Sequence, residues 1–209
     1  MKKRWHKILI YLGGILELIR LPNCKINNYS LPWHKFTQRE QTLLNIFSNL
    51  NHEIDTFLNV GFHDWQDSRN QWWVKFCKVN KINWNIIEIF LPNVKRAIAA
   101  GCPKDKIIHA DFLDTKAYNN YDCILHWHGP EHIDKKIFLD NLPSIENKAN
   151  KLLIFGMPLG EEIQGAQYGN KYEEHISSWE EIDWKNLGYS TMIVNDRSPG
   201  HITAYKIIK

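Results

Sequence analysis

The sequence predicts an α/β fold in which helices cover both faces of a mostly parallel seven-stranded sheet with one antiparallel strand, a three-layer sandwich. Short apolar runs alternate with segments of helical periodicity along most of the chain, which is typical of a parallel sheet. The last two apolar runs are joined only by Asp196–Gly200, a hairpin turn that makes one strand antiparallel. The 209 residues, 44% of them hydrophobic, suit one well-buried domain.

Turn signals and periodicity place the elements in order. Apolar residues at helical spacing predict a first helix after Thr37, reaching Leu50. The expected strands span residues 56–61, 84–90, 107–108, 121–125, 151–155, 189–195 and 202–208. Further helices are expected at residues 66–79, 94–100, 131–146 and 178–187. Ser178 and Glu181 form a capping box that predicts the start of the last helix.

A glycine-rich segment from Gly160 to His175 fits neither period. An irregular stretch of this length inside a compact domain is usually functional, and it could act as a lid that admits a substrate.

The N-terminus is basic and then apolar, from Lys2 to Ile19. The apolar part is interrupted by Gly13–Gly14 and contains Glu17, and it is shorter than the roughly 20 residues of a membrane-spanning helix. We therefore expect residues 1–52 to form an N-terminal helical extension or cap and residues 53–209 to form the α/β domain. We expect no integral membrane segment; weak peripheral membrane contact is the alternative.

Charge and cysteine usage exclude several classes of protein. The net charge is +3, with no basic stripe along the chain, so no nucleic-acid partner is expected. The four cysteines are far apart and form no Cys-x-x-Cys pair. A disulfide scaffold or structural zinc site is thus disfavoured, and a reducing cytoplasm is the expected compartment.

Side chains that titrate near neutral pH are most concentrated where the fourth strand ends, between Asp122 and His132. Three imidazoles and one carboxylate follow one another there: His126, His128, Glu131 and His132. In open α/β sheets, ligands bind at the carboxyl ends of the strands. If the strand extends to His128, the side chains of His126 and His128 share one face. They could then serve as a general base with a pKa near 6.5, as a metal site, or as substrate contacts.

Five segments of this chain resemble the class I S-adenosylmethionine (SAM)-dependent methyltransferase family, whose domain is Rossmann-like. Thr56–Gly61 matches the strand-one glycine motif, and Glu88 matches the acidic residue that ends strand two. Ala110–Phe112 matches the segment after strand three. Tyr121–Leu125 and Pro130–Ile133 resemble the strand-four motif and the helix start that follows it.

The resemblance implies SAM as cofactor and assigns roles to individual residues. Glu88 would accept the ribose hydroxyls, Gly61 would let the backbone approach the ligand, and Asp111 would accept from the adenine amine. The implied cofactor-binding residues are Asn59, Gly61, His63, Glu88, Ile89, Asp111, Phe112 and His126. Apart from the resemblance, the expected catalytic residues are His128, His126, Glu131 and His132 of the strand-four segment. The residues expected to bind the methyl acceptor are His175, Trp127 and Tyr168.

The glycine motif departs from the family pattern. The family has acidic-x-Gly-x-Gly-x-Gly, whereas this chain has Asn59, Gly61, His63 and Trp65 at those positions. Two bulky side chains therefore replace glycines beside the expected cofactor.

We interpret the sequence as a SAM-dependent methyltransferase that O-methylates a small molecule or a glycan and holds no metal. One alternative is a metal-dependent hydrolase or lyase that uses His126, His128 and His132. Another is a non-catalytic protein of the same fold that has lost SAM, for which the altered glycine motif argues. The oligomeric state is not predicted.

Overall fold

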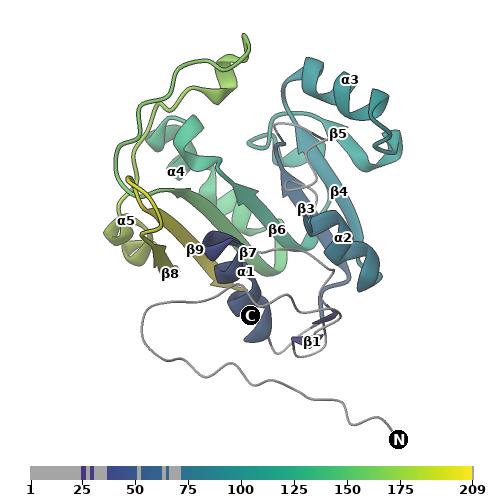
Figure 1. The fold of residues 1–209 in the computed structure, drawn as a ribbon, viewed down its shortest axis with the longest axis horizontal. Helices are drawn as coiled ribbons and strands as arrows, with labels where there is room; N and C mark the ends of the chain where they lie inside the picture. Colours follow the sequence, from purple (N-terminus) through teal and green to yellow (C-terminus); the bar gives the residue numbers. More distant parts are fainter. Residues whose placement is uncertain are drawn as a thin grey trace, which may run out of the picture.

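The computed structural model describes residues 25–26, 29–30, 37–50, 53–62, 65 and 72–208. Residues 1–24 of the expected N-terminal helical extension and the site residue His63 lie outside these residues. Figure 1 shows a central sheet flanked by helices.

The main sheet has seven strands in the order β5-β4-β3-β6-β7-β9-β8. They are β3 (Thr56–Val60), β4 (Asn83–Glu88), β5 (Ile107–His109), β6 (Tyr121–Trp127), β7 (Ala149–Pro158), β8 (Ser190–Val194) and β9 (His201–Ile207). Neighbouring strands from β5 to β7 are parallel, whereas β9 runs antiparallel to both β7 and β8. This confirms the predicted mostly parallel sheet with one antiparallel strand. A separate two-stranded ladder pairs β1 (Lys25–Ile26) with β2 (Tyr29–Ser30).

Five α-helices and four single-turn 3₁₀ helices occur in the described part of the chain. The α-helices are α1 (Gln38–Ser48), α2 (Trp72–Val79), α3 (Leu91–Ala99), α4 (Lys135–Glu146) and α5 (Glu181–Asn186). The 3₁₀ turns are Lys104–Lys106, Thr115–Ala117, Pro130–His132 and Lys171–Glu173.

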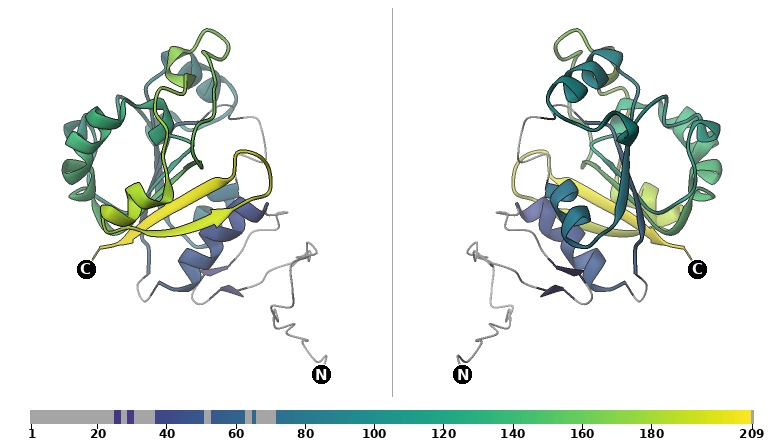
Figure 2. Two further views of the ribbon diagram at one scale, coloured as in Figure 1. Left: turned by 90° about the vertical axis from the view of Figure 1, so that its left-hand side faces the viewer. Right: turned by 90° about the vertical axis from the view of Figure 1, so that its right-hand side faces the viewer.

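The helices form two layers, one on each face of the sheet, and α1 and α4 lie on opposite sides in Figure 2. Alternation along the strands explains this, because successive side chains point to opposite faces. In β6, Cys123 and Leu125 pack into a core with α1 and α2, whereas Ile124 packs into a second core with Phe138 of α4. The expected three-layer sandwich is present.

Helix α1 is tied into the sheet layer next to it. Thr37 caps the helix in a capping box with Glu40. Arg39 donates to both carboxylate oxygens of Asp196, in the loop between β8 and β9, at 2.9 to 3.2 Å. Thr42 shares a buried hydrogen bond with Thr203 of β9.

Among the described residues, no helix combines the length and the apolar character needed to cross a membrane.

Two predicted helix starts are wrong. The helix expected from Glu131 is instead a 3₁₀ turn, Pro130–His132, and α4 begins only after Asp134, whose side chain accepts from the Ile137 N–H. The last helix is not capped by Ser178 and Glu181; its capping box is formed by Glu180 and Asp183. In each case the helix is capped by an acidic residue further along the chain, Asp134 three residues after Glu131 and Glu180 two residues after Ser178.

Candidate functional site

Most of the predicted site residues line one cavity at the carboxyl ends of β3, β4 and β6, whereas Glu131 is not part of its lining. The chain leaves β3 toward β4 on one side, while β6 adjoins β3 on the other, so this is the switch point where open α/β sheets bind ligands. The cavity has a volume of about 930 Å³. The predicted residues that line it are Asn59, Gly61, Glu88, Ile89, Asp111, Phe112, His126, Trp127, His128, His132, Tyr168 and His175.

Glu88 ends β4 with its carboxylate buried at the cavity wall. One oxygen accepts the Phe90 N–H at 2.7 Å and the other accepts the Phe62 N–H at 3.1 Å. Burial raises the pKa of Glu88, although these N–H groups and the side chain of Asn93 act to lower it. Each carboxylate oxygen has a further acceptor position, so Glu88 can still accept from the two hydroxyls of a diol.

Gly61 follows β3 in the left-handed region, with φ of +72°. A β-carbon built there meets no atom within 4 Å, so the backbone faces open space. The side chain of Asn59 donates to the Gly61 carbonyl at 2.7 Å and holds this turn. Asn59 thus stabilises the turn after β3 in addition to lining the cavity.

Trp65 does not crowd the cavity. It is absent from the lining and packs against Phe62 and Trp84, with ring centroids 6.2 and 6.1 Å away. One of the two bulky replacements in the glycine motif is therefore part of the aromatic core next to α2. The other, His63, lies outside the described residues.

Asp111 and Phe112 form the opposite wall, after β5. Asp111 is exposed, and its carboxylate accepts the Leu113 N–H at 2.8 Å. Phe112 is buried, stacked on Tyr118 and edge-on to His126, with ring centroids 5.8 and 4.9 Å away. The hydrogen bond from Tyr118 to the Phe112 carbonyl fixes this ring pair.

His126 is a neutral, packed histidine. It is buried between Phe112 and Phe155, and burial lowers its pKa to about 3. An imidazole with so low a pKa is a weak proton acceptor, and it does not titrate near neutral pH. The candidate general base is therefore not His126.

His128 does not share a face with His126, contrary to the sequence-based expectation. Strand β6 ends at Trp127, and His128 adopts a left-handed φ of +53°, which breaks the alternation. Its ring lies against Trp127 and His201, with centroids 6.1 and 5.1 Å away.

His128 is paired with Glu131 across the turn that follows β6. Its Nδ1 lies 3.3 Å from a Glu131 carboxylate oxygen, and its side chain is 36% exposed. Glu131 is buried, and burial acts to raise its pKa, but neighbouring His128 and His132 outweigh burial and hold the pKa below its usual value. Glu131 therefore carries a negative charge that can orient the His128 ring.

His132 meets His175 rather than the other two histidines of the strand-four segment. The two rings lie 4.9 Å apart between centroids. The set of three potential metal ligands in the described part of the chain is Glu131, His132 and His175, and not His126, His128 and His132. The metal-site alternative thus has a different ligand set from the one the sequence suggested.

The glycine-rich segment forms one side of the cavity. Gln167 and Asn170 pair across a tight turn in which Tyr168 and Gly169 both have positive φ, and Tyr168 is exposed at the tip. Several lining residues were not predicted from the sequence, among them Glu40, Leu43, Glu173 and Arg197. They come from α1, from this segment and from the β8–β9 loop, and no local motif connects those positions.

Solved structures of SAM-dependent methyltransferases share this fold. That of a methyltransferase from Clostridium acetobutylicum ATCC 824 has a TM-score of 0.58 and 12% identity, covering 81% of this chain and 90% of that one. The plantazolicin methyltransferase BamL, solved with a desmethylPZN analog and SAH, has a TM-score of 0.56 and 13% identity, covering 81% and 83%. An Archaeoglobus fulgidus enzyme has a TM-score of 0.52 and 14% identity, covering 81% and 94%.

At such identities the shared feature is the fold, which is that of class I SAM-dependent methyltransferases. No protein-family model and no curated protein matches the sequence.

Proposed function

We propose that this protein binds SAM in the cavity at the switch point and transfers its methyl group to an oxygen of a small molecule or glycan. The observation that carries the proposal is the placement of Gly61, Glu88 and Asp111. They follow three neighbouring parallel strands and line one cavity, within the fold of known SAM-dependent enzymes.

The cavity suits the separate parts of SAM. The space beside Gly61 can take the methionine portion, because no atom of the described residues lies within 4 Å of a β-carbon built there. Glu88 provides charge-assisted acceptors for the ribose diol. The exposed carboxylate of Asp111 is available to the adenine amine, and the apolar Ile89 and Phe112 line the wall between the two acids.

His128 is the residue that we propose removes the acceptor's proton. SAM supplies an activated methyl group when bound, so the protein has to align the acceptor and take up one proton. Glu131 lies beside Nδ1 of His128 and leaves Nε2 as the nitrogen that can accept that proton. Trp127, Tyr168 and His175 line the same cavity and are proposed acceptor contacts.

Titration calorimetry with SAM and with S-adenosylhomocysteine tests the first step. We expect both to bind the full-length chain at one site. If neither compound binds, the result would favour the non-catalytic alternative. Release of S-adenosylhomocysteine in the presence of a panel of phenols, hydroxy acids and sugars would then identify the acceptor class.

We also propose a cytoplasmic location. Cys77, Cys102 and Cys123 are free buried thiols, and free thiols are usual in a reducing compartment. Mass spectrometry of the intact protein after alkylation tests whether the thiols remain reduced.

A further inference from the structure

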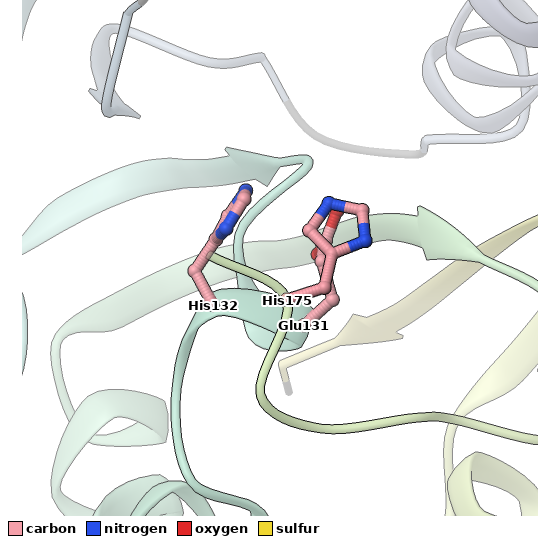
Figure 3. A group of neighbouring side chains, drawn as sticks. All are labelled: Glu131, His132 and His175. Atoms are coloured by element: carbon pink, nitrogen blue, oxygen red, sulfur yellow. The ribbon is translucent and has the colours of Figure 1, made fainter. Parts of the chain in front are cut away.

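We propose that Glu131, His132 and His175 form a binding site for one divalent transition-metal ion. A carboxylate oxygen of Glu131 and one ring nitrogen from each histidine lie within 4.8 Å of one another. Figure 3 shows the two imidazoles and the carboxylate brought together from the turn after β6 and from the end of the glycine-rich segment.

The buried carboxylate of Glu131 has one ion-pair partner among the described residues, His128. The residue is 2% exposed, and neither carboxylate oxygen accepts a hydrogen bond from any described residue. Buried carboxylates are ordinarily paired and hydrogen-bonded or coordinate metals, because burial of an unpaired charge is costly. His128 lies near one oxygen, at 3.3 Å, which leaves the other for a cation.

In both histidines Nδ1 contacts a backbone carbonyl, which leaves Nε2 as the nitrogen able to bind a metal ion. Nδ1 of His132 lies 3.1 Å from the Glu174 carbonyl, and Nδ1 of His175 lies 2.6 Å from the Glu162 carbonyl. A carbonyl only accepts, so each Nδ1 carries the proton and each Nε2 keeps its lone pair. Metal-ligating histidines almost always donate their other ring N–H in this way.

The backbone holds the two parts of the site together. The N–H groups of Ile176 and Ser177 both donate to the Glu131 carbonyl, at 2.9 and 3.1 Å. The Ser177 hydroxyl donates to the Pro130 carbonyl at 3.0 Å. These contacts fix His175 beside residues 131 and 132, although the segments are more than forty residues apart in sequence.

The spacing fits a single ion after a small movement. Two ligands at about 2.0–2.2 Å from one zinc ion are at most about 4.4 Å apart. Two imidazoles and one carboxylate suit a first-row transition ion, whereas Mg²⁺ and Ca²⁺ prefer oxygen ligands only. His132 and His175 both line the cavity, so an ion bound to them would lie at its wall. This proposal does not depend on methyl transfer.

Metal binding to chelator-treated full-length protein tests the proposal. We expect one equivalent of Zn²⁺ to bind in calorimetry, and one equivalent of Co²⁺ to give the visible absorption of a protein-bound ion. His175→Ala and, separately, His132→Ala should weaken Zn²⁺ binding by more than about 100-fold, beyond the effect of losing a supporting contact. His109→Ala removes an exposed histidine of the same chain and should leave the affinity unchanged.

Two results would overturn the site. One is the absence of stoichiometric Zn²⁺ and Co²⁺ binding by the wild-type protein. The other is equal Zn²⁺ affinity in His175→Ala, His132→Ala and His109→Ala, which would mean adventitious binding. His175 lies in an irregular segment outside the core, so His175→Ala should fold even if a substitution at Glu131 does not. SAM titration of the same samples is a separate measurement, so loss of metal binding and loss of SAM binding are distinguishable.

Discussion

The ring of His126 occupies the space that a β-carbon would take at Gly129. A β-carbon built at Gly129 lies 1.8 Å from Nε2 of His126, far inside van der Waals contact. The turn after β6 therefore depends on glycine for space, since the backbone lies directly against a buried ring.

Gly129→Ala should destabilise the protein by about 1–3 kcal/mol, the usual cost of overpacking. Gly165→Ala is the matched control, because a β-carbon there meets nothing within 4 Å; its effect should be within about 0.5 kcal/mol. Chemical denaturation monitored by tryptophan fluorescence measures both changes. Equal stability of the two variants would show that the turn can shift away from His126.

Glu88→Gln should weaken SAM binding by about 1.5–3 kcal/mol, because a charged acceptor of hydrogen bonds becomes neutral. Asp140→Asn makes the same charge change on the exposed surface of α4 and should leave SAM affinity unchanged. Calorimetry gives both values. The Gln side chain has a single acceptor oxygen and cannot accept both the Phe62 and the Phe90 N–H, so a thermal melt checks that the variant is still folded. An unaltered dissociation constant in a folded Glu88→Gln protein would remove Glu88 from the cofactor site.

Asp111→Asn should weaken SAM binding less than Glu88→Gln does. Asp111 is exposed, and it would accept one hydrogen bond from a neutral amine in contact with solvent. The same calorimetric titration ranks the two variants. A larger loss of SAM affinity in Asp111→Asn than in Glu88→Gln would contradict the proposed assignment of ribose and adenine contacts.

His128→Ala should lower the rate of methyl transfer by about 10²–10⁴-fold, the usual contribution of a general base. The affinity for SAM should not change, because a base acts on the acceptor and not on the cofactor. Release of S-adenosylhomocysteine measures the rate once an acceptor is known. Wild-type turnover by His128→Ala would rule out this assignment.

His201 should make the protein acid-sensitive. It is fully buried, neither ring nitrogen has a hydrogen-bond partner among the described residues, and burial lowers its pKa to about 2. The charges of His128, Arg39 and Arg197 act in the same direction. In the unfolded chain its pKa is about 6.5. Below that pH the unfolded state therefore binds a proton at this residue, whereas the folded state does not. The contribution of His201 to the free energy of unfolding is fully present above about pH 6.5 and is lost progressively as the pH falls toward 2.

His201→Phe should reduce this acid dependence. Below about pH 6 the slope of unfolding free energy against pH should fall by up to about 1.4 kcal/mol per pH unit, which corresponds to one proton. Between about pH 7.5 and 9 the slopes of the two proteins should coincide, which is the internal control. Denaturant titrations at a series of pH values measure both ranges. Parallel curves below pH 6 would contradict a buried neutral His201.

The sequence by itself determined the α/β class, the order of the strands along the chain and the residues at their carboxyl ends. Glycine and acidic residues after apolar runs mark those ends locally, so Gly61, Glu88 and Asp111 could be found without a structure. Parallel strands bring their carboxyl ends to one edge, and for that reason these residues also share a cavity.

Only the tertiary structure decided which histidines lie next to one another. The left-handed backbone at His128 breaks the strand alternation, and the 3₁₀ turn at Pro130–His132 replaces the expected helix. Residues far along the chain contact both segments, since the His128 N–H donates to the Gly156 carbonyl and the Ser177 hydroxyl donates to the Pro130 carbonyl. His175 reaches His132 because backbone hydrogen bonds join Glu131 to residues 176 and 177, and no periodicity in the sequence encodes such a long-range pairing. Burial likewise sets the low pKa of His126, since it depends on which aromatic rings the fold packs around the imidazole.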